Sequence, residues 1–193
     1  TTEIYTLSLH DALPIFSKFF ITHRQYFTLI ENDLSLVYRL GYQTTLSGEV
    51  PFFYQSQVIT SRLTGYSSEG LGGSSTLRGV LRNRVIGDGF VLGNIELRWK
   101  PFYFTFLKQD CYLGLNLFYD MGMITNEIDM PADLQSRFNN NLTQYSYNDF
   151  FSSGKEKLHQ SVGISIMPVM NENFVVAVDI GKGFKEQVGN IGI

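Results

Sequence analysis

Few residues in this sequence have the type and spacing that catalysis or metal binding needs. His23 and His159 each lack a cysteine or carboxylate at metal-ligand spacing, and a plain strand position explains them more simply. Cys111 is the single cysteine and is interpreted as structural. GKGF at Gly181–Phe184 lacks the frame of a phosphate-binding loop, and no nucleophile elbow or calcium loop occurs. The sequence therefore predicts no enzyme, no metal and no cofactor.

The charged residues are more informative than these scattered groups. A long connection from Gly48 to Asp88 contains GLGGSSTLRGV, Gly70 to Val80, which carries Arg78. Glu96 and Asp120 follow in the next two apolar segments. Taken singly, Arg78 could be a solvated loop residue, Glu96 could pair with Arg98 or Lys100 nearby, and Asp120 could cap a turn. A connection of this length is nevertheless much longer than an ordinary hairpin loop, which indicates that it has a function of its own.

Alternation of apolar and polar residues with a period of two predicts the strands that position these groups. From Tyr112, one face collects Leu113, Leu115, Leu117, Tyr119, Met121 and Met123. The same pattern predicts strands at Leu34–Thr45, Phe90–Lys100, Leu158–Met167 and Phe174–Ile180, with another beginning at Ile191 and one of ambiguous parity at Lys18–Ile30. The fold is therefore predicted to be all-β.

Glu96 and Asp120 both fall on the less apolar face of adjacent predicted strands. On the strand that carries Asp120, this face holds Tyr112, Gly114, Asn116, Phe118, Asp120 and Gly122. Two carboxylates on one face would repel each other unless a cation lies between them, and a guanidinium can hold both through its donor fork. A face with small and polar side chains is typical of a barrel interior.

The lengths of the strands and of their connections favour a membrane barrel. Strands of ten residues or more match the ~9 to 11 residues that cross a bilayer at a tilt. Short turns alternate with long loops, which is the asymmetry of outer-membrane barrels. The turns are predicted at Glu31–Asp33, Leu107–Asp110 and Pro168–Glu172, and the long loops at Gly48–Asp88 and Thr125–Lys157.

Aromatic residues near the strand ends, such as Trp99, Phe102 and Tyr103, fit an interfacial girdle. Alternation alone leaves open a soluble sandwich or lipocalin-like barrel whose apolar faces pack inward and line a ligand cavity.

The composition excludes several classes of protein. Hydrophobic residues make up 44% of the sequence and charged residues 17%. The net charge of -3 gives no sign of the basic surface that usually binds nucleic acid. No apolar run approaches the ~18 residues of a membrane helix.

The first fifteen residues stand apart from the rest. Thr1 to Ile15, TTEIYTLSLHDALPI, matches codon for codon the translation of a common sequencing-adapter oligonucleotide. We therefore interpret residues 1–15 as a non-native segment and residues 16–193 as the protein's own sequence, without its true N-terminus and any signal peptide.

Three motifs in order resemble the outer-membrane assembly factor superfamily, the BamA/TamA-like bacterial surface antigen family. The signature of its long inward-folding loop is a hydrophobic-Arg-Gly-hydrophobic tetrad after a Gly-Gly pair, here Leu77, Arg78, Gly79 and Val80 after Gly72 and Gly73. GNIELR at Gly93–Arg98 and LFYDMG at Leu117–Gly122 resemble the two strands that follow. The resemblance extends over nearly all of residues 16–193.

The resemblance implies that the loop at about residues 48–88 lies inside the barrel and that its arginine meets acidic residues of the wall. Here these would be Arg78 with Glu96 and Asp120. It also implies that the chain is a fragment, about the last seven strands of a sixteen-stranded antiparallel transmembrane β-barrel. The family's terminal strand ends in an aromatic residue, so the chain, which ends at Ile193, is expected to be clipped there as well.

The implied function is the insertion or translocation of other proteins at the bacterial outer membrane. The implied partners are the lipid bilayer, client β-barrel proteins and accessory lipoproteins. The same barrel also occurs in two-partner secretion translocators and behind patatin-like domains, and the soluble lipocalin-like binder remains a further alternative.

Overall fold

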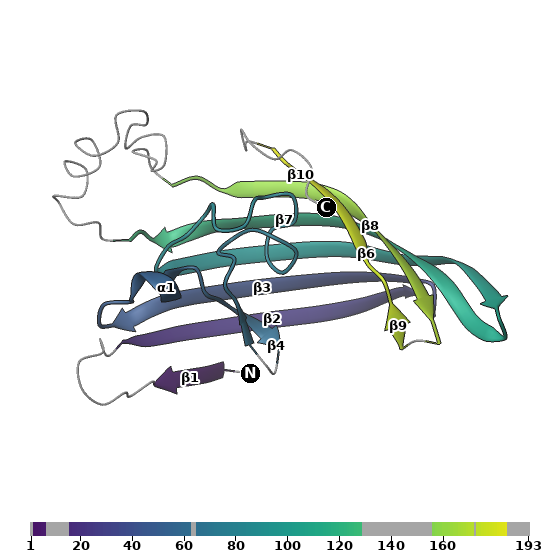
Figure 1. Ribbon diagram of the computed structural model, residues 1–193, viewed down its shortest axis with the longest axis horizontal. Coiled ribbons are helices and arrows are strands. Elements are labelled where there is room, and N and C mark those ends of the chain that lie inside the picture. Colours follow the sequence, from purple (N-terminus) through teal and green to yellow (C-terminus); the bar gives the residue numbers. More distant parts are fainter. Residues whose placement is uncertain (1, 7–15, 63–64, 129–155, 172, 185–193) are drawn as a thin grey trace.

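Antiparallel strands form one large sheet in the computed structural model, which describes residues 2–6, 16–62, 65–128, 156–171 and 173–184. Its strands are β1 (Thr2–Thr6), β2 (Ser17–Ile30), β3 (Leu34–Ser47), β6 (Gly89–Phe106), β7 (Gln109–Asn126), β8 (His159–Met170), β9 (Phe174–Val175) and β10 (Val178–Gly183). They lie in the order β1-β2-β3-β6-β7-β8-β10, with β9 paired to β8 (Figure 1). The all-β prediction is confirmed.

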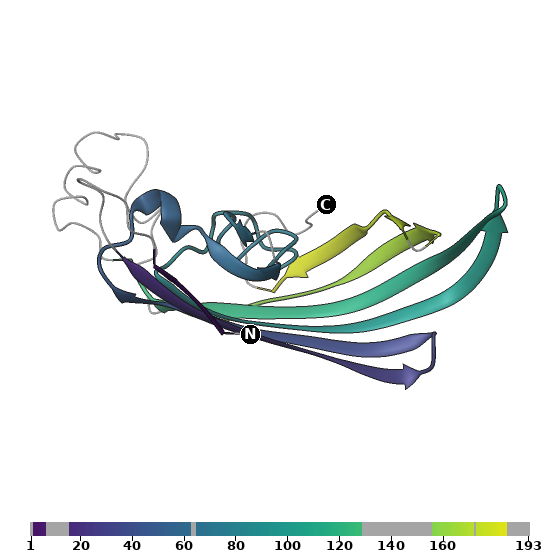
Figure 2. The same cartoon turned by 90° about the horizontal axis from the view of Figure 1, so that it is seen from below.

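The sheet is curved and holds the long loop on its concave side, so the described residues form a half-barrel (Figure 2). The loop contains a short helix, α1 (Phe52–Gln55), and a small two-stranded sheet of β4 (Val58–Arg62) and β5 (Gly65–Ser67). The strand expected at Ile191 and most of the loop expected at Thr125–Lys157 lie outside the described residues. The total of sixteen strands stays a prediction.

The two faces of the sheet have opposite chemistry. On the face toward the loop, polar side chains are buried, namely Lys18, Gln43, Asn94, Asn116, Asp120, Ser161 and Ser165. On the other face large apolar side chains are exposed, among them Leu40, Ile95, Trp99, Leu117, Val162, Ile164 and Ile180. This arrangement is the reverse of a soluble sheet and is that of a barrel with a polar lumen.

The soluble interpretation requires the apolar faces to pack inward around a ligand cavity. In the described residues they lie on the side away from the loop, and successive residues of a strand point to opposite faces. An apolar outer band of this kind is stabilised by lipid rather than by water.

Strands β6 and β7 are longer than the alternation predicts, at 18 residues each. The register between them shifts from Trp99 to Phe102, where Lys100 and Pro101 lie opposite the single residue Gly114 and form a bulge with one extra residue. Proline has no N–H for the ladder, so a bulge accommodates it. Beyond the bulge, Phe102–Phe106 is apolar or aromatic at nearly every position and gives no period-two signal.

The predicted turn at Pro168–Glu172 begins too early, and the predicted strand at Phe174–Ile180 is interrupted. In the structure β8 runs on to Met170, and Asn171 adopts the left-handed conformation of a turn at φ 49°. The returning strand divides into β9 and β10 because its register brings Val176 opposite Pro168, which cannot donate a ladder hydrogen bond. The Val176 N–H instead donates to the Pro168 carbonyl at 3.2 Å.

An apolar cluster joins the loop to the inner wall at one end of the strands. It consists of Val58, Leu71, Leu77, Val80 and Val85 from the loop with Phe90 and Leu92 from β6. Leu71 and Leu77 are fully buried, so their burial contributes to holding the loop against the wall.

Candidate functional site

Two neighbouring rows of inner-face residues form the floor of the candidate site. The strand register aligns Arg39, Asn94, Asp120 and Ser161 across β3, β6, β7 and β8. The adjacent row consists of Val37, Glu96, Phe118 and Gly163. Glu96 and Asp120 therefore face the lumen from adjacent strands, one row apart, as their sequence parity indicates.

Arg78 reaches from the loop to both carboxylates. Its Nε lies 2.8 Å from Asp120 Oδ2, and its Nη2 lies 2.9 Å from Asp120 Oδ1 and 2.7 Å from Glu96 Oε1. The Arg78 backbone N–H also donates to Asp120 Oδ2 at 3.1 Å. The guanidinium carbon lies 3.7 Å from the centre of the Phe118 ring, which adds a cation–π contact.

Burial makes these contacts matter energetically. The side chain of Asp120 is 0% exposed, that of Arg78 10% and that of Glu96 14%. A buried carboxylate is costly unless it is paired and hydrogen-bonded, and Asp120 accepts from Arg78 and also from Asn94 Nδ2 at 2.7 Å. Burial alone would lower the pKa of Arg78, but the hydrogen bonds and charges of Asp120 and Glu96 outweigh it and raise the pKa.

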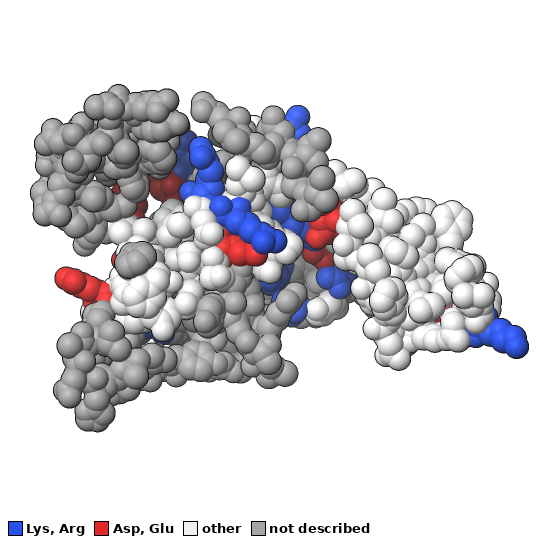
Figure 3. All heavy atoms as spheres, in the orientation of Figure 1, with Lys and Arg blue, Asp and Glu red and all other residues white. Residues whose placement is uncertain are grey.

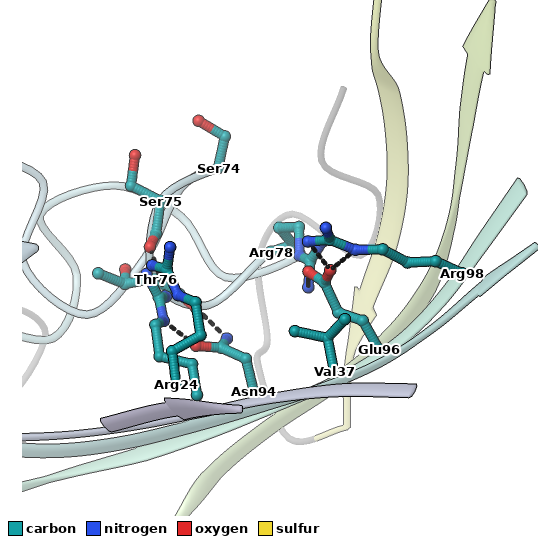
Figure 4. A pocket seen from close by; sticks show the side chains of 10 residues that line it. Arg24, Val37, Ser74, Ser75, Thr76, Arg78, Asn94, Glu96 and Arg98 are labelled. Atoms are coloured by element: carbon teal, nitrogen blue, oxygen red, sulfur yellow. Dashed lines mark hydrogen bonds and ion pairs between the residues drawn. The ribbon is translucent and has the colours of Figure 1, made fainter. Parts of the chain in front are cut away.

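Glu96 has a second cation as its partner. Arg98 donates to Glu96 Oε2 from Nε at 2.8 Å and from Nη2 at 2.6 Å (Figure 4). The pairing of Glu96 with Arg98, which the sequence offers as an alternative, and its pairing with Arg78 thus coexist. Because Glu96 keeps a partner when Arg78 is removed, Asp120 depends more strongly on Arg78.

The loop backbone is compact around the tetrad. The hydroxyl of buried Thr76 accepts from the Gly72 N–H at 2.8 Å, and the Gly73 N–H donates to the Val80 carbonyl at 3.0 Å. Gly79 has a φ of 86°, and a Cβ there would lie 2.6 Å from the carbonyl carbon of Gly181 on β10. Only glycine allows this conformation together with this close approach.

Side chains of the inner wall also donate to carbonyl groups of the loop, and no sequence pattern predicts these contacts. Asn94 Nδ2 donates to Thr76 O at 2.8 Å, Arg39 Nη2 to Ser75 O at 2.7 Å, and Gln43 Nε2 to Gln57 O at 2.9 Å. A loop inside a barrel has buried carbonyl groups that need such partners. Asn94 and Arg39 lie on the predicted polar face, so parity placed them in the lumen but could not pair them with the loop.

The charged residues gather where the loop meets the sheet. In Figure 3, blue and red atoms gather in the middle of the molecule, and the end formed by β9 and the β6–β7 turn is mostly white apart from blue atoms at its tip. Within the described residues no group of three or more His, Cys, Asp or Glu is placed to hold a metal ion. No helix in the same part of the chain is long and apolar enough to cross a membrane.

A curved antiparallel sheet with an apolar outer face, a polar inner face and a loop tied to its inner wall defines the class of outer-membrane β-barrel proteins. Residues 5–184 match the model of the Omp85 superfamily domain, and the chain belongs to this superfamily. Its members are bacterial outer-membrane proteins that insert or translocate proteins. The resemblance stated from the three motifs is thereby confirmed. No curated protein and no solved structure matches the chain.

Proposed function

We propose that this chain is part of the barrel of a BamA/TamA-like assembly factor, which inserts other β-barrel proteins into the bacterial outer membrane. The bidentate contact of Arg78 with buried Asp120, shared with Glu96, is the observation that carries the proposal. In this proposal these residues organise the lumen and are not reacting groups, and the barrel has no catalytic role. Its partners are the outer-membrane bilayer, client β-barrel proteins and accessory lipoproteins.

In the proposed mechanism, client insertion takes place at the barrel seam, where the first and last strands meet. The first and last strands of such a barrel pair weakly, and a client strand adds to the exposed edge by β-augmentation. The loop tetrad, Leu77 to Val80, packs against β6, β7 and β10, and the Arg78 contacts fix it to the first two of these. A wall held in shape from within keeps the seam in register while the client strand is added.

Arg78→Ala in the complete gene product is expected to release the loop and to weaken client assembly. Removing one partner of a buried ion pair costs about 3–5 kcal/mol because the remaining charge is left uncompensated. The measurements are the rate of protease cleavage within the loop and the folding rate of a client β-barrel in vesicles that contain the protein. Cleavage should rise and client folding should slow.

Arg82→Ala is the matched control, because Arg82 lies in the same loop but is 66% exposed, and within the described residues its ion pair is with Glu69. It should leave both rates nearly unchanged, as expected for an exposed ion pair. If Arg78→Ala leaves both loop cleavage and client folding as they are, the proposal fails.

A translocator for one secreted partner is the second candidate within the superfamily, as is a barrel attached to a patatin-like domain. Depletion of the protein from the cell separates these functions. An assembly factor predicts a general loss of β-barrel proteins from the outer membrane, whereas a translocator predicts the loss of a single secreted protein.

A further inference from the structure

A cavity of about 230 Å³ lies beside the ion-pair cluster, between the loop and strands β2, β3 and β6. Its lining includes Arg24, Arg39, Arg78 and Arg98 against one carboxylate, Glu96 (Figure 4). Asp120, behind Arg78, brings the formal balance of these six residues to 4 - 2 = +2. The cavity is smaller than the ~300–1,000 Å³ of sites for drug-sized ligands, so it suits a small ion or a single chemical group.

The positive charges in the cavity are unequally compensated. Arg78 is held by Glu96 and Asp120, and Arg98 by Glu96. Among the described residues, Arg39 donates only to neutral acceptors, Asn94 Oδ1 and Ser75 O, both at 2.7 Å.

The strand register adds a second like charge beside Arg39. Arg24 on β2 lies directly opposite Arg39 on β3, and both line the cavity. Like charges in directly opposed positions of an antiparallel pair destabilise it. An anion bound between the two guanidiniums would remove this repulsion and use their planar donor forks.

We propose that this cavity binds a small phosphate-type oxyanion, either inorganic phosphate or a phosphate monoester. A phosphate-type oxyanion offers several acceptors to the donor forks of Arg24 and Arg39, both of which line the cavity. Because Arg39 Nη2 also holds the loop carbonyl of Ser75, the bound anion fixes the side chain that connects β3 to the loop. Occupancy therefore tightens the loop against the wall. This site does not depend on the function proposed above.

The test uses the complete membrane-embedded protein in phosphatidylcholine vesicles, with inorganic phosphate as the probe. Phosphate replaces chloride at constant ionic strength, and the rate of protease cleavage in the loop is measured. Cleavage should slow saturably as phosphate rises. Arg39→Gln removes the central donor, and the apparent affinity for phosphate should fall by about tenfold or more, the range expected for hydrogen bonds to charged groups.

Arg82→Gln is the control for a lost loop cation and should keep the phosphate response, since Arg82 does not line the cavity. Arg24→Gln provides a second test if Arg39→Gln fails to fold, because Arg24 lines the cavity opposite Arg39. It should weaken the saturable effect of phosphate on loop cleavage, and an unchanged phosphate response would contradict the site. No saturable effect in the unchanged protein, or an equal effect in Arg39→Gln, overturns the proposal.

A further arm identifies the source of the phosphate group. Vesicles containing phosphatidic acid, a lipid phosphate monoester, are compared with phosphatidylcholine vesicles in phosphate-free buffer. The cavity lies on the inner face of the sheet, so we expect soluble phosphate alone to protect the loop. Protection by phosphatidic acid that Arg39→Gln abolishes would uphold the site and assign it to a lipid headgroup.

Discussion

At the scale of residues, the two acidic partners of Arg78 differ in how much they depend on it. Asp120 is fully buried and receives donors from Arg78 and Asn94, whereas Glu96 also holds Arg98, whose side chain is 44% exposed. A buried charge without a partner costs more than one that keeps a partner near solvent.

Asp120→Asn should therefore damage the protein more than Glu96→Gln. Asparagine at this position places an amide nitrogen where Arg78 Nε or Asn94 Nδ2 needs an acceptor, and the cost is about 1–3 kcal/mol or more. Glu96→Gln should cost about 1 kcal/mol or less. Unfolding of each variant by urea in detergent compares the two, and an equal or reversed ranking contradicts the difference in burial.

Sequence reasoning could predict the residues of the cluster but not all of its contacts. Arg78, Glu96 and Asp120 followed from a family motif and from strand parity. The hydrogen bond from Asn94 to Asp120 and the cation–π contact with Phe118 depend on the register of β6 against β7 and on rotamers, which no local pattern encodes. That these residues hold the loop inside the barrel as their role in the protein stays a proposal.

At the scale of elements, the loop tetrad depends on its glycine. Gly79 combines a φ of 86° with close contact to the backbone of Gly181 on β10. Gly48 has a similar φ of 80° but is exposed at the start of the loop. Comparing substitutions at Gly79 and Gly48 therefore separates the strain of the left-handed conformation from the cost of the close contact with β10.

Gly79→Ala should destabilise the loop by more than Gly48→Ala. A left-handed conformation costs a residue with a Cβ roughly 1–2 kcal/mol, and this contribution is common to both variants. At Gly79 the added methyl group must also displace the β10 backbone. Protease cleavage of the loop should therefore rise clearly in Gly79→Ala and little in Gly48→Ala; equal cleavage in the two would show that the contact with β10 is unimportant.

The strands were predictable where one face is apolar and the other polar. Where both faces carry aromatic or apolar residues, as from Phe102 to Phe106, the period-two signal disappears although the strand continues. The break between β9 and β10 depends on Pro168 in the neighbouring strand, so a single-strand pattern could not reveal it.

At the scale of the whole molecule, the placement of polar residues inside and apolar residues outside fits a membrane barrel rather than a soluble one. The sequence predicted which residues share a face but left open whether the apolar face points outward, because alternation is the same in both cases. The loop lies on the polar face and buries it, so the apolar face points away from the loop. The extent of the barrel beyond these strands and the origin of residues 1–15 stay predictions.

The outward direction of the apolar face is the central claim, and Trp99 tests it most directly. Trp99 is the single tryptophan of this chain and is 49% exposed on the outer face of β6. The complete protein and its Trp99→Phe variant are reconstituted in vesicles with and without brominated lipid, and the difference between their fluorescence signals isolates Trp99. We predict that brominated lipid quenches most of this difference and that aqueous iodide does not. Quenching by iodide without quenching by brominated lipid would contradict the membrane-barrel account.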